Sequence, residues 1–178
     1  MARPTLDTLL SEKVLYPLLG VILLGALILL GVRPRHYGSA ADFSLPVVSD
    51  AGEAGPDRVS LRDLRGHPVL LDFWATWCGP CRFETPILVR LHQRFQARGL
   101  VVIGVNVDEG GPIAVPAFRR HFGIDYPLVY DEGMGASGHY GIEGLPTLVL
   151  IDRAGQVRMR HPGMISESEL AQAITDVL

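Results

Sequence analysis

The motif Cys78-Gly79-Pro80-Cys81 constrains the fold of this chain more than any other feature. Its two cysteines are the only ones among 178 residues, so no framework of several disulfides is available and the fold needs a hydrophobic core. An apolar run at 68–74 precedes the motif, and apolar residues at helical spacing follow it as far as Gly99. The two thiols therefore stand where a buried strand ends and a helix begins.

Stretches typical of strands and stretches typical of helices alternate through the rest of the chain. This alternation ends with a hairpin and with a last helix that starts at the capping-box residues Ser166 and Glu169, and it predicts an α/β fold with a mixed β-sheet flanked by helices. The ranges expected to be extended are 43–48, 59–61, 68–74, 100–107, 127–130, 147–151 and 156–160, and those expected to be helical are 78–98, 116–122, 136–140 and 166–178.

A second feature lies near the N-terminus, where residues 14–32 form a run of 19 residues without a charge. At about 1.5 Å per residue a helix of this length spans roughly 28 Å, close to the hydrocarbon core of a bilayer. A cleaved signal peptide would have a shorter apolar region of about 7–15 residues, and Gly38-Ser39-Ala40 is only a weak cleavage match. We therefore expect a retained transmembrane helix.

This interpretation divides the chain into four parts. They are an N-terminal cytoplasmic tail at 1–13, a transmembrane anchor at 14–32, a linker at 33–41 and a folded domain at 42–178. Two Lys or Arg residues flank the apolar run on each side, so charge alone does not set its orientation. The net charge is −3 with acidic and basic residues interspersed, and nothing indicates a nucleic-acid partner.

Two cysteines three residues apart at the start of a helix suit reversible dithiol–disulfide chemistry. The free N–H groups and partial positive charge of a helix N-terminus favour a thiolate at Cys78, which we expect to be exposed and to attack. Cys81, one turn further in, is expected to be less exposed and to resolve the mixed disulfide. A zinc site needs four ligands, and covalent haem attachment needs a histidine where Arg82 stands. We therefore expect no metal, and no cofactor beyond a redox-active Cys78–Cys81 disulfide.

The segment Val69–Pro86 resembles the active-site segment of thioredoxins, and Gly144-Leu145-Pro146-Thr147 resembles their cis-proline loop. The apolar anchor, the stretch 42–46 and the position of Glu84 are similar to the membrane-anchored, extracytoplasmic thioredoxin-like proteins of bacteria. That group includes the thiol–disulfide proteins of cytochrome c maturation. The chain differs from the group at Asp72, where Asn is frequent, and after the proline, where the cytochrome-specific branch often has an acidic residue.

The resemblance implies a thiol:disulfide oxidoreductase with a thioredoxin-like fold. A single span would hold it on the bacterial cytoplasmic membrane, with the catalytic domain on the periplasmic side. It would reduce disulfides in exported proteins, apocytochrome c among them, with electrons from a transmembrane donor, and we expect it to be monomeric. The resemblance also implies that the Leu145–Pro146 bond is cis and that the Leu145 backbone pairs with an extended substrate strand.

Two carboxyl groups are candidate catalytic residues beside the cysteines. Asp72 is expected to be partly buried near Cys81 and to move a proton to and from its thiol; the alternative is a solvated carboxylate at a strand edge. Glu84, three residues after Cys81, is either a second acid for that thiol or a surface residue of the helix. The candidate substrate-binding residues are Trp77, Gly79, Pro80, Leu145 and Pro146.

Two other functions stay open. In the first, the domain is a membrane-tethered redox sensor or binding module, whose disulfide switches the binding of a partner without turnover. In the second, the chain is a thiol peroxidase. Such an enzyme would have a threonine three residues before its reactive cysteine, where Ala75 stands.

Overall fold

The computed structural model of the protein describes residues 16–17, 37–49 and 57–178. The predicted tail and membrane anchor, residues 1–32, lie outside these ranges apart from 16–17. Within the described ranges, no helix is long and apolar enough to cross a membrane.

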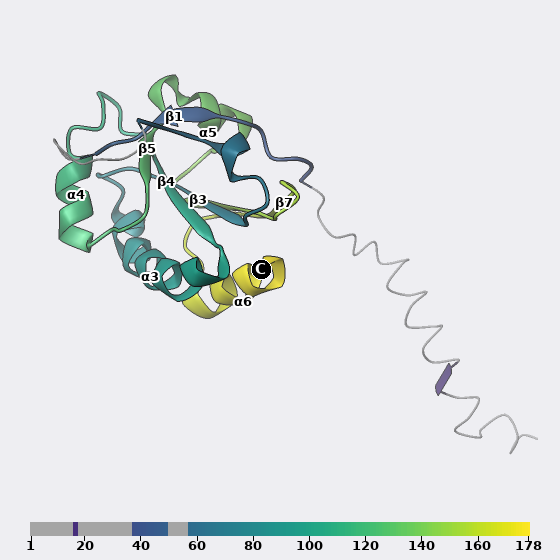
Figure 1. Ribbon diagram of the computed structural model, residues 1–178. Helices are drawn as coiled ribbons and strands as arrows, with labels where there is room; N and C mark the ends of the chain where they lie inside the picture. The colour runs from purple at the N-terminus through teal and green to yellow at the C-terminus, as the bar shows by residue number, and fades with distance from the viewer. Residues whose placement is uncertain (1–15, 18–36, 50–56) are drawn as a thin grey trace, which may run out of the picture. The chain divides into compact units, whose positions relative to one another are not determined.

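The folded domain is the compact unit His36–Leu178. Its described strands are β1 (Ser44–Pro46), β2 (Arg58–Ser60), β3 (Val69–Trp74), β4 (Val101–Asn106), β5 (Leu128–Tyr130), β6 (Thr147–Ile151) and β7 (Val157–Pro162). Five of them form a mixed sheet in the order β5-β4-β3-β6-β7, and β1 pairs with β2 in a separate small sheet (Figure 1). β3, β4 and β5 are parallel, and β6 is antiparallel to both β3 and β7. The predicted mixed sheet is confirmed.

Helices cover both faces of the sheet. They are α3 (Gly79–Phe95), α4 (Val115–Phe122), α5 (Gly135–His139) and α6 (Glu167–Val177), with 3-10 helices η1 (Leu61–Leu64), η2 (Gln96–Arg98) and η3 (Glu132–Met134). Figure 1 shows α3 and α6 on one side of the sheet, and α5 with β1 on the other. The predicted ends are confirmed: Gly99 has a left-handed conformation after η2, and Ser166 and Glu169 form a capping box at the start of α6.

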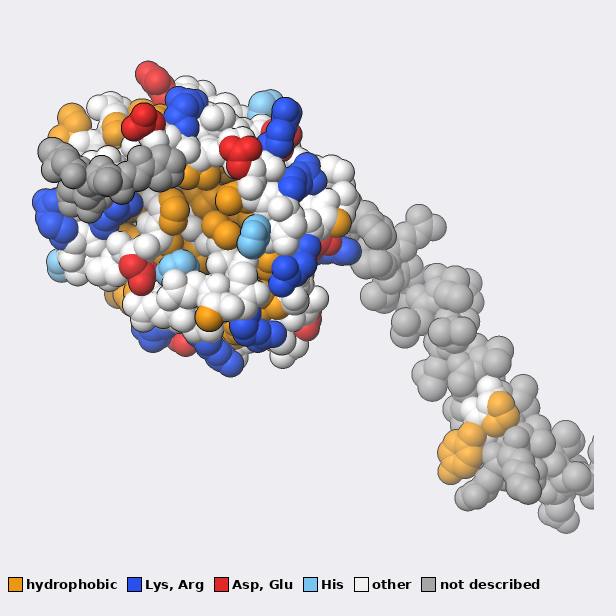
Figure 2. Space-filling view, in the orientation of Figure 1, with side chains coloured by type: hydrophobic (Ala, Val, Ile, Leu, Met, Phe, Trp, Pro, Cys, Tyr) orange, Lys and Arg blue, Asp and Glu red, His pale blue; other side chains and the backbone are white. Residues whose placement is uncertain are grey.

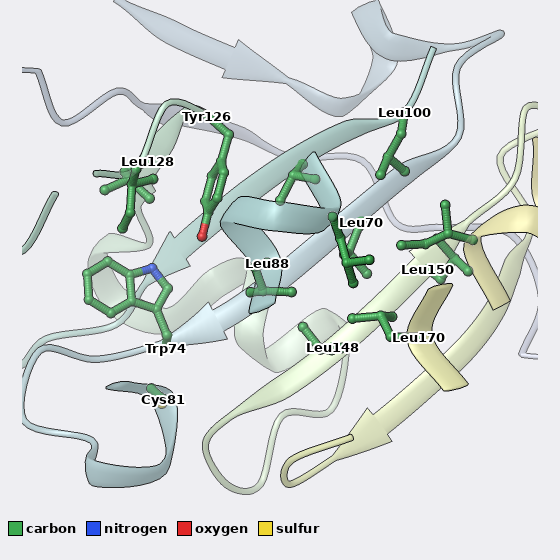
Figure 3. Packing of buried hydrophobic residues seen from close by; sticks show 14 of the residues in the cluster. Leu70, Trp74, Cys81, Leu88, Leu100, Tyr126, Leu128, Leu148, Leu150 and Leu170 are labelled. Atoms are coloured by element: carbon green, nitrogen blue, oxygen red, sulfur yellow. The ribbon is translucent and has the colours of Figure 1, made fainter. Parts of the chain in front are cut away.

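The central strand β3 is buried on both faces, as its unbroken apolar run predicts. Leu70 and Trp74 point toward α3 and α6, where Figure 3 shows them near Leu88 and other buried leucines. Leu71 and Phe73 pack on the opposite face, against β1, η1 and α5. Because successive side chains of a strand alternate between faces, position 72 lies on the face covered by α3.

The described segment 37–49 runs along both edges of the main sheet. Ser39 forms an isolated antiparallel bridge next to the start of β7, and Val47 forms one with β5. These contacts cover edges that would otherwise be open to pairing with another chain. Within the predicted linker at 33–41, Ser39 and Ala40 therefore pair with the chain just before β7.

The surface of the domain mixes both signs of charge. Figure 2 shows Arg, Asp and Glu side chains interspersed around an apolar area in the middle of the displayed face. This distribution matches the interspersed charges of the sequence and produces no large field of one sign on that face.

Candidate active site

A disulfide joins Cys78 and Cys81 at the N-terminus of α3. Cys78 is the N-cap residue, with an extended backbone, and the helix begins with Gly79 and Pro80. Proline suits this first turn because it lacks an N–H group that would need a partner there. The backbone N–H of Cys81 donates to Sγ of Cys78 at 3.2 Å. The helix N-terminus is thus directed at the sulfur that we expect to carry the negative charge in the reduced protein.

Both cysteines are shielded in this oxidised state. Cys78 is 4% exposed and Cys81 is 2% exposed. Their order agrees with the expectation that Cys81 is the less exposed of the two, but the expectation of an exposed Cys78 is wrong for the oxidised protein. The reason is that Cys78 belongs to the wall of a groove, with the loop before β6 on the opposite side.

The groove has a volume of about 360 Å³ and brings together most of the predicted substrate-binding residues. Trp77, which is 66% exposed, lies on one side with the motif, and Leu145 lies on the other. The Leu145–Pro146 bond is cis, as predicted, and Pro146 itself is buried. The remaining lining residues are Val107, Glu109, Met134, Ile142, Glu143 and Gly144.

Asp72 lies in the middle of β3, opposite Gly104 of β4 and Leu148 of β6. It is 4% exposed, and its Oδ1 atom has no hydrogen-bond partner among the described residues. Burial and, second, the charge of Glu84 raise the pKa of Asp72 well above its ordinary value. The predicted burial is confirmed, and the alternative of a solvated carboxylate at a strand edge is wrong.

Glu84 faces the interior from α3 and is only 2% exposed, so the alternative of a surface residue is also wrong. Neither of its carboxyl oxygens makes a hydrogen bond within normal geometry to the described residues. Burial raises the pKa of Glu84 to about 7, against a smaller lowering by the backbone N–H of Ile165. A carboxyl group with this pKa can release or accept a proton near neutral pH.

A glycine beside Asp72 makes room for the surrounding aromatic side chains. A Cβ atom at Gly104 would lie 2.5 Å from Cδ2 of Leu128 and 3.0 Å from Nε1 of Trp74. It would also lie 3.5 Å from the ring of Tyr126, whose hydroxyl points into this part of the core (Figure 3). Burial and then the charge of Asp72 raise the pKa of Tyr126, so its hydroxyl stays protonated. The inner side of the disulfide thus faces buried carboxyl and aromatic side chains.

No group of three or more His, Cys, Asp or Glu side chains is placed to hold a metal ion within 16–17, 37–49 and 57–178. Both cysteines are in the disulfide. The groups that this arrangement offers for chemistry are the sulfur pair and the two carboxyl groups.

Two residues that the sequence analysis did not single out belong to this site. Asp108 is buried between the groove-lining Val107 and Glu109 and accepts a hydrogen bond from the backbone of Thr76. A polar residue directly after a buried strand was its only signal in the sequence. Met134 lines the groove with φ at +58°, a conformation that its residue type does not indicate.

Comparison with known families matches residues 38–160 to the family described as AhpC/TSA. The chain belongs to the AhpC/TSA family. Among curated relatives of this AhpC/TSA protein, the thiol-disulfide oxidoreductase ResA of Bacillus thuringiensis (strain Al Hakam) is 39% identical over 100 residues, covering 56% of this chain and 57% of the relative. The ResA of Bacillus subtilis (strain 168) is 37% identical over 111 residues, covering 62% of each chain. The match thus spans less than two thirds of the length of these relatives.

Solved structures show the same fold. A thiol:disulfide interchange protein of the thioredoxin family from Chlorobium tepidum TLS has a TM-score of 0.68 and 29% identity, covering 82% of this chain and 97% of that chain. A secreted thiol-disulfide isomerase from Corynebacterium glutamicum also has a TM-score of 0.68, at 23% identity, covering 78% of this chain and 84% of that chain. The predicted thioredoxin-like fold of this AhpC/TSA protein is confirmed.

Proposed function

We propose that this protein catalyses thiol–disulfide exchange through the Cys78/Cys81 pair. One observation carries the proposal: a disulfide at the N-terminus of an α-helix opens into a groove whose other wall is a cis-proline loop. The relatives named thiol-disulfide oxidoreductase ResA support the same chemistry.

In the reduced protein, the thiolate of Cys78 attacks one sulfur of a substrate disulfide. A bond forms between Cys78 and that sulfur, and the other substrate sulfur leaves as a thiolate and takes up a proton. Cys81 then loses its proton and attacks Sγ of Cys78, which releases the second substrate sulfur. Two electrons and two protons pass to the substrate, and the protein disulfide re-forms.

The two buried carboxyl groups are the proposed proton partners of Cys81. Asp72 and Glu84 lie on the inner side of the disulfide, away from the groove through which a substrate enters. Their raised pKa values make the deprotonated forms of these groups stronger bases for a thiol proton than an ordinary carboxylate. When Cys81 attacks, one of these groups accepts the thiol proton, and it returns the proton when the dithiol is regenerated.

The direction that we propose is the reduction of disulfides in exported proteins. The Gly-Pro pair between the cysteines is that of thioredoxin, whose reduction potential of about −270 mV makes it a reductant. The apolar run at 14–32 supports a membrane anchor with the domain outside the cytoplasm. Because that space is oxidising, the dithiol needs a transmembrane electron donor. Apocytochrome c is the specific substrate that we propose, on the resemblance to cytochrome c maturation proteins.

A resolving-cysteine variant tests the exchange mechanism. Cys81→Ser keeps the attacking thiol but cannot release the substrate, so mixed disulfides should accumulate on Cys78. They are detected as reductant-sensitive high-mass species on non-reducing gels and identified by mass spectrometry. The matched control, Cys78→Ser, lacks the attacking thiol and should trap much less. Equal trapping by both variants, or none by Cys81→Ser, would contradict the proposal.

Two assays separate this function from its rivals. Repeated reduction of insulin disulfides by the wild-type protein with an added dithiol supports an enzyme, whereas a single turnover supports a redox-switched binding module. Consumption of peroxide without a protein partner would support a thiol peroxidase.

A further inference from the structure

Asp108 is a buried carboxylate next to the redox motif that the proposed exchange mechanism does not use. It follows β4 and is 6% exposed. Its Oδ1 atom accepts a hydrogen bond from the backbone N–H of Thr76 at 2.8 Å. Thr76 lies two residues before Cys78, so this bond reaches from one loop of the groove to the loop that carries the attacking sulfur.

The peptide that Asp108 holds belongs to a tight turn. The backbone N–H of Cys78 donates to the carbonyl of Ala75 at 3.1 Å, which places Thr76 and Trp77 at the two central positions. Such a turn can rotate its central peptides unless another group fixes them. The bond from Thr76 to Asp108 supplies that fixed point, immediately before the N-cap of α3.

Asp108 is itself held from several sides. Its backbone N–H donates to Oδ1 of Asn106 at 3.2 Å, and its carbonyl accepts from the hydroxyl of Tyr130 at 3.3 Å. The N–H of Val107 donates to the carbonyl of Trp74 at 3.0 Å. Asn106 is fully buried and pairs with Trp74 in the sheet. The carboxylate therefore extends from the rigid ends of three neighbouring strands.

We propose that Asp108 is a positioning residue for the attack by Cys78, because it fixes the turn that aims this sulfur at the amides of the α3 N-terminus. The inference rests on the proposed exchange function. Asp108 also lies between Val107 and Glu109, which line the groove. The bond from Thr76 to Asp108 therefore also fixes this wall of the groove relative to Trp77 and Cys78. Loss of the hydrogen bond from Thr76 to Asp108 makes the orientation of the Cys78 sulfur less fixed, but it removes no reacting group.

The test uses the full chain with Cys81→Ser, so that reduced Cys78 is the only thiol, and compares Asp108→Ala with Asp108→Asn. Asn keeps an oxygen that accepts the Thr76 bond, whereas Ala does not. The first readout is hydrogen exchange of the Thr76 amide. The second is the rate of alkylation of Cys78 by iodoacetamide over a range of pH. Because iodoacetamide reacts with Cys78 directly, the alkylation rate can be measured even if the protein turns over no protein substrate.

We expect Asp108→Ala to speed exchange at Thr76 and to slow alkylation about fivefold to tenfold, the size that one lost hydrogen bond explains. Asp108→Asn should stay within about twofold of its parent for both readouts. Normal alkylation in a folded Asp108→Ala variant would overturn the proposal. So would an Asn variant as slow as the Ala variant, because charge and not the hydrogen bond would then matter.

A matched control separates positioning from general stability. Asp152 is also a buried carboxylate that accepts a backbone N–H, from Gln156 at 2.9 Å, but it follows the far end of β6. Asp152→Ala should lower thermal stability and leave the alkylation rate of Cys78 unchanged. If Asp108→Ala fails to fold, Asp108→Ser takes its place, since its shorter side chain does not span the 2.8 Å bond; an alkylation rate like that of the parent would then overturn the proposal.

Discussion

At the scale of the residue, Phe83 and Glu84 exchange the places that their side chains usually take. Phe83 is 75% exposed, whereas Glu84 is 2% exposed. An ionised carboxylate without a partner is costly to bury, so Glu84 stays protonated to a higher pH, with its pKa raised to about 7. This arrangement does not stabilise the fold at neutral pH, but it puts a titratable group one helical turn from Cys81.

The raised pKa of Glu84 predicts how the free energy of unfolding depends on pH. Its pKa rises from an ordinary 4.5 to about 7 on folding, so between these values the folded protein holds a proton that the unfolded chain has released. The stabilisation from this bound proton is complete below about pH 4.5 and is lost as pH rises through about 7. The shift in the pKa of Glu84 corresponds to a loss of roughly 3 kcal/mol in the free energy of unfolding. We expect the free energy of unfolding of the oxidised protein to fall between about pH 5 and pH 8, and to fall less in Glu84→Gln.

Urea denaturation at the two pH values measures this difference. Asp72→Asn should also reduce the slope, because burial raises the pKa of Asp72 in the same direction. Asp152 is the control: burial acts to raise its pKa, but hydrogen bonds from Gln156 and Arg158 lower it overall. Its titration lies below this pH window, so Asp152→Asn should leave the slope unchanged. An unaltered slope in both Glu84→Gln and Asp72→Asn would contradict the prediction.

The burial of Glu84 could be read from spacing but not from residue type. Hydrophobicity alone places Phe83 inside the molecule and Glu84 outside. Counted from Cys81, however, the buried side chains of α3 recur at intervals of three and four, and Glu84 falls on that stripe. Asp108 is harder to find, because its role depends on a contact with a loop 32 residues earlier in the chain.

At the scale of the element, the strands and long helices were predictable because each buries an apolar run or stripe with a period of its own. The ends of two helical segments were also predictable, because glycine is the residue that most readily adopts the positive φ found at helix ends. Gly99 has this conformation after η2, and Gly123 has it after α4. The segment 131–134 was not predicted. It turns through Gly133 and Met134, both at positive φ, without any apolar periodicity.

Met134 links this segment to the groove. It adopts a left-handed conformation (φ 58°, ψ 31°) that costs a residue with a Cβ atom about 1 kcal/mol. Asp131 holds the start of α5 beside it by accepting hydrogen bonds from the N–H groups of Ala136 and Ser137. We expect Met134→Gly to keep or raise the free energy of unfolding, by up to about 1 kcal/mol, and to raise the KM for a protein substrate because an apolar groove wall is lost.

Met134→Ala is the matched variant, since it keeps the Cβ atom and removes the rest of the side chain. It should raise KM in the same way without any gain in stability. Chemical denaturation and steady-state reduction of a protein disulfide give the two quantities. If KM stays unchanged in both variants, Met134 does not contact the substrate.

At the scale of the whole molecule, the sheet topology explains why the site forms where it does. β3 and β4 are parallel and end together, at Trp74 and Asn106. β6 is antiparallel to β3 and begins at the same edge, with Thr147 opposite Phe73. The redox motif, the Asp108 loop and the cis-proline loop therefore meet at one end of the sheet. The order of strands could be inferred from the resemblance to thioredoxins, but the side chains that fill the groove required the structure.

The proposed location makes this groove accessible to exported proteins only if residues 14–32 anchor the chain. Two arginines in that run, at Leu23→Arg and Leu24→Arg, would add roughly 6–8 kcal/mol to the cost of insertion, whereas Leu23→Ile and Leu24→Ile would add almost none. We expect the wild-type and isoleucine chains to stay with membranes in alkaline carbonate and the arginine chain to be released. Protease added to intact spheroplasts should digest the domain of the wild-type chain. A wild-type chain that carbonate extracts would contradict the anchor, and a domain that resists protease until the cells are lysed would contradict its placement outside the cytoplasm.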